Sequence, residues 1–143
     1  MNIRPAELKD KEEILKTIGL LYINMPDFVW STEPFIEKQI KNAEYFLLEF
    51  ENKIVGIISL KKKKDQIHIE TLAVIKEFQK KGFGSKLIEF AKQFAKENGF
   101  KVLQAYSFVE YQAEKFYKKL GFKKLDYFGY YKNHQYHCFE ICL

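Results

Sequence analysis

The stretch from residue 72 to residue 85 decides the expected fold, and it reads Leu72-Ala73-Val74-Ile75-Lys76-Glu77-Phe78-Gln79-Lys80-Lys81-Gly82-Phe83-Gly84-Ser85. Its apolar start predicts the end of a buried strand. The apolar positions after Gly82 recur at helical spacing and predict an amphipathic helix over residues 82–98. A basic loop with two glycines therefore joins a strand to a helix.

This loop has the composition of an anion-binding site. The first NH groups of a helix have no intrahelical partner, and the helix dipole adds partial positive charge there. Gly82 and Gly84 have no Cβ, so a ligand can approach the backbone closely, and Lys80 and Lys81 add two full charges. We expect phosphate or pyrophosphate to bind here. The spacing matches neither a Walker loop nor a Rossmann fingerprint, and a loop with incidental lysines is the alternative.

Outward from this loop, the residue pattern alternates strands with helices. Apolar and β-branched runs predict strands at 2–4, 45–50, 54–60, 66–74, 102–108, 122–131 and 135–141. Helical spacing recurs before residue 45 in two segments, near 14–22 and 35–40, and after the first long helix at 113–120. This order predicts the α/β class, with a mixed α+β sheet and helices on both faces.

Length and composition place the chain among ordinary globular proteins. It has 143 residues, of which 47% are hydrophobic and 30% charged, and we expect one domain over 1–143. These values exclude a disordered or collagen-like chain. No apolar run approaches the roughly 20 residues of a membrane span.

The net charge of +5 is spread along the chain except at four consecutive lysines, 61–64. That run is typical of a solvated strand end, and a contact for a polyanion is the alternative. Cys138 and Cys142 are too far apart along one strand for a disulfide, so we expect free thiols. With no apolar signal core at the start of the chain, this favours a cytoplasmic protein without membrane contact.

Two motifs resemble one family. Residues 79–84, Gln-Lys-Lys-Gly-Phe-Gly, match the Q/R-x-x-G-x-G/A signature of the GNAT superfamily of acyl-CoA-dependent N-acyltransferases. Downstream, the family's A-x-x-F-Y-x-K-x-G-F helix is matched by Ala113-Glu114-Lys115-Phe116-Tyr117-Lys118-Lys119-Leu120-Gly121-Phe122. The opening Ile3-Arg4-Pro5-Ala6 is also similar, and the resemblance covers essentially the whole chain in the right element order.

The resemblance implies a GNAT-like fold and acetyl-CoA as the cofactor. The central sheet would be mostly antiparallel, with one splayed parallel pair formed by the strands at 66–74 and 102–108. The pyrophosphate would bind the NH groups of Gln79, Lys80, Lys81, Gly82, Phe83, Gly84 and Ser85. The pantetheine arm would lie along Leu72, Ala73 and Val74, because its amides can satisfy a splayed strand. Ala113 and Phe116 would complete the cofactor site, which contains no metal.

The implied reaction is direct transfer of an acetyl group to a primary amine of a small molecule or protein. A base must take the proton of the amine, and Glu70 is the first candidate, with His68 the alternative. Tyr117 stands where the family usually has the tyrosine that protonates the leaving thiolate. For each, a structural role in the sheet or the core is the alternative.

Two features concern the rest of the site. The family usually has Asn seven residues before the tyrosine, but here that residue is Glu110, which cannot donate a hydrogen bond when ionised. The acceptor pocket would be lined by aromatic side chains, which can hold an amine by cation–π contact. The candidates are Phe28, Trp30 and Tyr130, with Tyr127 and Tyr131 also near.

Two other functions compete with catalysis. A CoA-binding module that has lost activity would bind the cofactor without turnover. A small basic nucleic-acid-binding protein would show steep salt dependence, but the aromatic residues follow core periodicity, so we expect no nucleic-acid partner. The aromatic hairpin at the end of the chain makes a homodimer possible.

Overall fold

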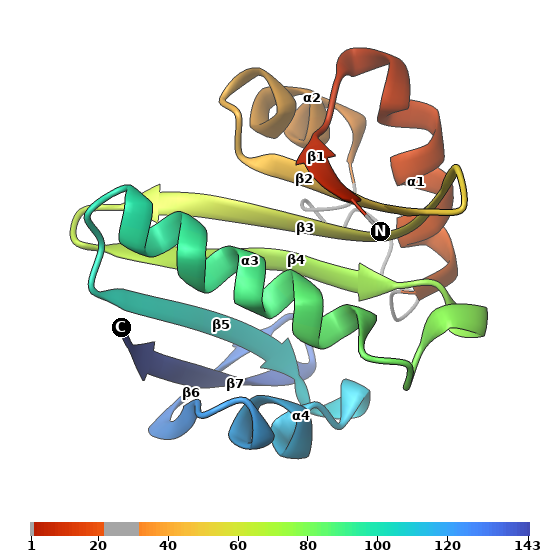
Figure 1. The fold of residues 1–143 in the computed structure, drawn as a ribbon. Coiled ribbons are helices and arrows are strands. Elements are labelled where there is room, and N and C mark those ends of the chain that lie inside the picture. The colour runs from red at the N-terminus through yellow and green to blue at the C-terminus, as the bar shows by residue number, and fades with distance from the viewer. Residues whose placement is uncertain (1, 22–31) are drawn as a thin grey trace. The chain divides into compact units, whose positions relative to one another are not determined.

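The computed structural model describes residues 2–21 and 32–143 (Figure 1). The helices are α1 (Lys11–Leu21), α2 (Glu33–Lys41), α3 (Phe83–Glu97) and α4 (Glu114–Lys119). Short 3-10 turns occur at η1 (Leu8–Asp10), η3 (Lys76–Phe78) and η4 (Val109–Tyr111). The strands are β1 (Asn2–Pro5), β2 (Tyr45–Phe50), β3 (Lys53–Lys63), β4 (Gln66–Val74), β5 (Val102–Phe108), β6 (Lys123–Tyr131) and β7 (His134–Cys142).

The strands form a mixed sheet in the order β1-β2-β3-β4-β5-β7-β6. β4 and β5 are parallel, with Ile67, His68 and Ile69 opposite Leu103, Gln104 and Ala105. The other described pairs, β1 with β2, β2 with β3, β5 with β7 and β6 with β7, are antiparallel. The predicted mixed, mostly antiparallel sheet with one parallel pair is confirmed. The separation of β4 and β5 beyond these three pairs stays a prediction.

The chain divides into two compact units, which are described separately. Unit 1 contains residues 1–60 and 70–90, and unit 2 contains residues 61–69 and 91–143. β3, β4 and α3 contribute residues to both units. The prediction of one domain over 1–143 stays a prediction.

In unit 1, the sheet carries helices on both faces. One face packs against α1 and α2 through a core of Ala6, Ile14, Ile18, Ile36, Ile40, Tyr45, Leu47, Ile57 and Ala73. On the other face, the rings of Phe46 and Phe90 lie 4.8 Å apart. Gly56 lets α3 approach, because a Cβ there would lie 3.1 Å from the Leu87 side chain. The alternating side chains of β2 thus pack against helices on both faces of the sheet.

In unit 2, the core lies between the strands and the helical segments that follow them. Leu103 and Ala105 of β5 are fully buried, as is Phe139 of β7. The Tyr117 ring of α4 stacks on Phe139 at 4.8 Å. Lys92 in the second half of α3 donates to the Leu120 carbonyl at 3.0 Å, so this part of α3 is tied to the end of α4.

The lysine run and the cysteines follow their predicted interpretations. Lys61, Lys62 and Lys63 form the outer end of β3, and Lys64 lies in the turn before β4. Cys138 and Cys142 are free thiols. Across residues 2–21 and 32–143, no helix has both the length and the apolar character that a bilayer crossing requires.

Candidate functional site

The predicted anion loop in unit 1 leaves β4 through η3 and enters α3. The Gln79 side chain donates to the Val74 carbonyl at 2.8 Å and ties the loop to the end of the strand. Two residues adopt left-handed backbone conformations, Lys80 at φ 61° and Gly82 at φ 89°. Glycine suits the second position because a side chain there would be strained. The two left-handed residues turn the chain sharply into the helix.

Aromatic rings hold the base of this loop. Phe78 and Phe83 lie at its two ends, with ring centroids 5.7 Å apart, and both contact Phe50 of β2 edge to face. Phe83 is only 7% exposed, so its side chain is packed in the protein and only its backbone amide could bind a ligand. The Nζ atoms of Lys53 and Lys81 each lie 5.7 Å from the Phe78 ring. Aromatic packing thus anchors the loop that carries Lys81.

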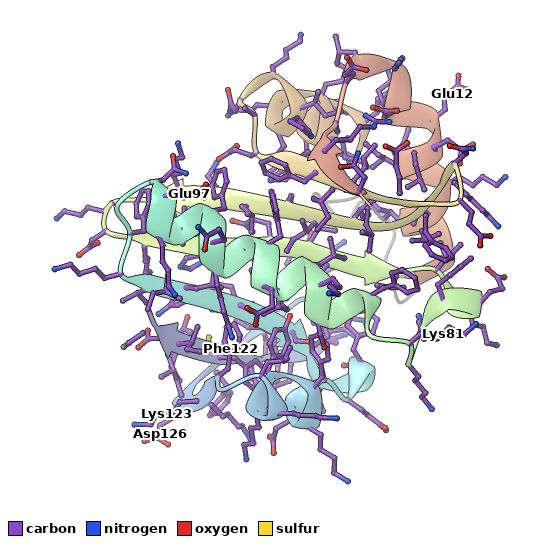
Figure 2. All side chains as sticks on the ribbon, in the orientation of Figure 1. Glu12, Lys81, Glu97, Phe122, Lys123 and Asp126 are labelled. Atoms are coloured by element: carbon purple, nitrogen blue, oxygen red, sulfur yellow. The ribbon has the colours of Figure 1, made fainter. Side chains whose placement is uncertain are left out.

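The loop offers donors for an anion. The first intrahelical hydrogen bond of α3 runs from the Lys86 amide to the Gly82 carbonyl, at 3.1 Å. The amides of Phe83, Gly84 and Ser85 precede it and therefore have no intrahelical acceptor. A Cβ added to Gly82 would meet no atom within 4 Å, so the space over the turn is open. Lys80 and Lys81 are exposed beside it, and Figure 2 marks Lys81 on this loop. These features fit a diphosphate.

The predicted pantetheine strand is the last part of β4. Ala73 is 8% exposed and belongs to the unit 1 core, whereas Leu72 and Val74 are half-buried. The side chain of Ala73 is therefore packed in the core, so this residue could contact a ligand only through its backbone. Glu70, the first candidate base, is half-buried on the same strand, also in unit 1.

His68, the alternative base, lies in unit 2 and is almost completely buried, with 3% of its surface exposed. Burial, with the nearby charge of Lys63, lowers the pKa of its imidazole to about 4. The ring is therefore neutral near neutral pH and a weak proton acceptor. Its centroid lies 5.1 Å from that of Tyr106.

Tyr117, the predicted proton donor, lies in the core of unit 2. It is 4% exposed, and its ring contacts Phe116 and Phe122 in addition to stacking on Phe139. Its amide donates to the Ala113 carbonyl at 3.0 Å, which fixes it one turn into α4. The tyrosine thus has a rigid orientation, which a proton donor needs and a core residue also shows.

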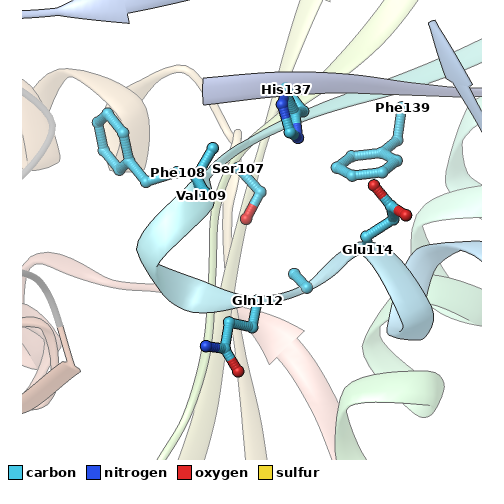
Figure 3. Close-up of a pocket in the computed structure, with 8 residues that line it drawn as sticks. Ser107, Phe108, Val109, Gln112, Glu114, His137 and Phe139 are labelled. Atoms are coloured by element: carbon cyan, nitrogen blue, oxygen red, sulfur yellow. The ribbon is translucent and has the colours of Figure 1, made fainter. Parts of the chain in front are cut away.

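A cavity of about 110 Å³ lies beside this tyrosine's stacking partner, Phe139. Its walls come from β5, η4, the start of α4 and β7, and are formed by Ser107, Phe108, Val109, Gln112, Ala113, Glu114, His137 and Phe139. Figure 3 shows Ser107, Glu114 and His137 gathered near the Phe139 ring. Ala113, a predicted cofactor residue, lines this cavity, whereas Phe116, which is half-buried, and Tyr117, which is buried, do not.

Glu110 is paired within unit 2. Its carboxylate contacts Nδ1 of His134 across η4 and β7, and this hydrogen bond lowers the pKa of Glu110. The Glu110 carboxylate, which stands in place of the family's usual Asn, is therefore already hydrogen-bonded to a side chain of the same unit. The sequence identified the residue, but its partner lies 24 positions away.

The predicted acceptor residues divide between described and undescribed segments. Phe28 and Trp30 lie outside the described residues. Tyr130 and Tyr127 are 64% and 58% exposed on β6, and Tyr131 is half-buried. Tyr130 contacts Phe128 edge to face at 6.2 Å.

Sequence reasoning missed a polar row across three strands of unit 2. Gln66, His68, Gln104 and Glu140 are joined by side-chain hydrogen bonds from β4 through β5 to β7. The spacing of Gln66 and His68 places both on one face of a strand. Nothing local in the sequence identifies Gln104 or Glu140 as their partners, because strand register decides that contact.

Comparisons with known proteins agree with this geometry. Residues 15–122 match the model of the Acetyltransferase (GNAT) family. Over 111 residues the chain is 30% identical to N-acetyltransferase family 8 member 3 of Rattus norvegicus, an alignment that covers 69% of this chain and 49% of that protein. The chain thus spans about half the length of this curated relative.

Solved structures show the same fold. Ard1 from Thermoplasma volcanium has a TM-score of 0.84 at 19% identity, over 99% of this chain and 97% of that one. The paia N-acetyltransferase from Thermoplasma acidophilum, solved in complex with coenzyme A, has a TM-score of 0.80 at 19% identity, over 99% and 98%. The match to the family model spans most of the chain, and the protein belongs to the Acetyltransferase (GNAT) family.

Proposed function

We propose that this protein transfers an acetyl group from acetyl-CoA to a primary amine of a small molecule or a protein. The observation that carries the proposal is the loop of residues 79–85. Three amides without intrahelical acceptors, a left-handed Gly82 and two exposed lysines together suit a diphosphate. Family membership supports coenzyme A as the molecule that bears it.

The residues that would hold coenzyme A supply backbone groups more than side chains. The amides of Phe83, Gly84 and Ser85 bind the diphosphate, with Lys80 and Lys81 adding charge and Gln79 holding the turn. The backbone of Leu72, Ala73 and Val74 binds the pantetheine amides, and Ala113 and Phe116 border the same ligand. When bound, acetyl-CoA supplies the acetyl group as an activated thioester.

Direct attack by the amine needs two proton transfers by the chain. The protonated amine first loses one proton and so becomes a nucleophile. Its nitrogen then forms a bond to the acetyl carbon as the carbon–sulfur bond breaks, and it loses a second proton, to solvent, while the sulfur gains one. Glu70 takes the proton from the amine. Tyr117 donates its phenolic proton to the leaving thiolate and regains one from solvent. Rigid packing of Tyr117 on Phe139 supports a fixed donor direction.

The acceptor side of the proposal rests on aromatic residues. Phe28, Trp30 and Tyr130 hold the amine by cation–π contact before it loses its proton. The large exposed fraction of Tyr130 supports access for a small molecule or a protein chain end. The proposal also includes a single domain over 1–143, a cytoplasmic location and a homodimer.

A binding experiment followed by a turnover experiment tests the function. Thermal shift with acetyl-CoA, with CoA and with an oligonucleotide is expected to show stabilisation by the first two ligands only. Stabilisation by the oligonucleotide alone would contradict the proposal. Thiol release from acetyl-CoA is then followed over a panel of primary amines. Binding of CoA with no thiol release for any amine would indicate a binding module instead of an enzyme.

A further inference from the structure

β6 is the last strand of the sheet, and β7 is its one neighbour among the described strands (Figure 1). Alternate backbone N–H and C=O groups of β6 therefore face away from β7, toward the edge of the sheet. Proteins usually protect such an edge with charged residues, prolines or bulges. The register of β6 is irregular between Lys124 and Phe128, but residues 127–131, Tyr-Phe-Gly-Tyr-Tyr, contain no charge and no proline. This part of the edge is suited to pairing with another strand.

The same stretch exposes large aromatic residues. Tyr127, Phe128 and Tyr130 are 58%, 51% and 64% exposed. Phe128 and Tyr130 lie two positions apart on one face of the strand, and their rings contact each other at 6.2 Å. On the other face the space beside Gly129 is filled by Tyr136, because a Cβ on Gly129 would collide with its phenol. Three aromatic residues, each about half exposed, amount to roughly 300 Å² of accessible surface, which is the size of patch that often has a function.

The aromatic residues of β6 are self-complementary. In a two-fold symmetric antiparallel pair, each residue lies opposite the residue that is equally far from the centre in the other copy. With Gly129 at the centre, Phe128 of each copy lies opposite Tyr130 of the other. Side chains that are directly opposite point to the same face, so two rings from each copy form one cluster of four. Aromatic cross-strand pairs of this kind stabilise antiparallel strands.

The charges beside the aromatic stretch agree with the same centre. Pairing about Gly129 brings Asp126 of each copy alongside Lys132 of the other, and both residues are exposed. A centre at Phe128 would instead bring Lys124 alongside Lys132, which is unfavourable because like charges repel. The charge pattern of this strand therefore favours a second copy of the chain as its partner.

We propose that two copies of this chain pair through β6, antiparallel and with Gly129 at the two-fold axis. The aromatic patch is small beside the roughly 800 Å² that each partner buries in a standard interface, so the dimer is expected to be weak and reversible. The pairing gives a structure to the homodimer included above, and it rests on residues of unit 2 alone. Tyr130 is also a proposed acceptor residue, so Phe128 of the second copy would border the acceptor, a consequence that rests on the proposed function.

Sedimentation equilibrium of the whole chain tests the dimer, without any ligand and from about 1 μM to about 1 mM protein. The wild type is expected to change from monomer to dimer within this range. Phe128→Ser removes two of the four rings and is expected to raise the dissociation constant about tenfold. The matched control is Leu8→Ser in η1, because Leu8 is 50% exposed, nearly as much as Phe128, and lies outside β6.

Three results would overturn the proposal. One is a wild type that stays monomeric, and another is an equal dissociation constant for the two variants. The third is a monomer whose β6 amides are protected from hydrogen exchange, because another segment of the same chain would then cover this edge. A monomeric wild type that still releases thiol from acetyl-CoA would refute the dimer and leave the acetyltransferase function standing.

The register is tested by exchanging charges. Asp126→Lys brings lysines together at both ends of the pair, and Lys132→Asp brings aspartates together, so each variant alone is expected to dimerise about tenfold more weakly than the wild type. When the two variants are mixed, opposite charges meet again, and heterodimers of nearly wild-type affinity are expected. Unchanged melting temperatures show that both variants are folded. If the mixture forms no heterodimer, the register centred on Gly129 is wrong.

Discussion

The loop of residues 79–85 and the polar row of unit 2 are built in opposite ways. The loop uses consecutive residues, and its donors are backbone amides whose direction is set by the turn into α3. The row uses side chains 72 positions apart at its ends, His68 and Glu140, brought together by strand register. The turn at Gly82 has open space around it, whereas His68 of the row is buried.

This difference decides which amino-acid substitutions each arrangement can tolerate. A backbone donor survives most side-chain changes and fails when the backbone conformation changes. A side-chain row fails when one member is replaced, because each orientation depends on its neighbour. Changes to the loop should therefore act on cofactor affinity, and changes in unit 2 on turnover and on protonation.

The largest effect is expected for Tyr117→Phe, which tests whether turnover depends on unit 2. Loss of the proton donor is expected to lower kcat roughly 10²-fold, with CoA affinity retained. The phenyl ring still stacks on Phe139, so the melting temperature should change little. Steady-state kinetics across pH measure the effect, with Tyr111→Phe in η4 as the control. Wild-type turnover across pH would remove the assigned acid role.

Next in size is the effect of Gly82→Val, which tests the backbone side of the comparison. A β-branched residue at φ 89° is strained and changes the turn that aims the amides, so CoA affinity should fall about 10²-fold. Gly99→Val is the matched control, since Gly99 also has a left-handed φ, of 80°, and open space around it. Calorimetric titration with CoA compares the two. Equal losses in both variants would mean that strain, not the loop, sets affinity.

The burial of His68 predicts an acid-sensitive step in stability. Its pKa is lowered from 6.5 to about 4 in the folded state, so unfolded chains bind the proton first as the pH falls. The stability that neutral His68 contributes is fully present above pH 6.5 and is lost as the pH falls toward 4. At pH 5, the free energy of unfolding is lower by about 2 kcal/mol for this reason. Urea unfolding at pH 8 and pH 5 is compared between wild type and His68→Gln. Other acid-sensitive pairs, such as Arg4 with Asp10, act equally in both proteins. Parallel pH dependence in the two proteins would contradict a neutral, buried His68.

The smallest effect is expected for Lys81→Gln. The side chain is exposed, so its contribution to binding is screened, and CoA affinity should fall about threefold and less at high salt. Lys64→Gln removes a charge from the turn before β4 and serves as the control. Titrations at two salt concentrations measure both. A larger loss in Lys64→Gln would favour the lysine run as the polyanion contact.

The sequence predicted the elements well where one short stretch determines them. Helix spacing after Gly82 and the glycine at 99 bracket α3, which runs from Phe83 to Glu97 as expected within one residue of each end. The loop of residues 79–85 could be predicted for the same reason, because its candidate donors come from consecutive residues. β3 runs three residues beyond the predicted end, because Lys61, Lys62 and Lys63 continue an extended strand despite their charge.

The candidate site residues of unit 2 could be chosen from the sequence only where a family motif names them. Tyr117 was identified in this way, and so was Glu110, but the His134 that engages Glu110 was not. The partners of His68 depend on the pairing of β4 with β5 and of β5 with β7. A shift of one residue in either register would place Gln104 or Glu140 on the other face. Spacing in the sequence does not contain that information.

The central claim is that the amides of residues 79–85 bind the diphosphate of coenzyme A. A crystal structure with CoA tests it most directly. The account predicts the diphosphate within hydrogen-bond distance of the amides of Phe83, Gly84 and Ser85. Density for the diphosphate at any other part of the molecule, with these amides facing only solvent, would contradict it.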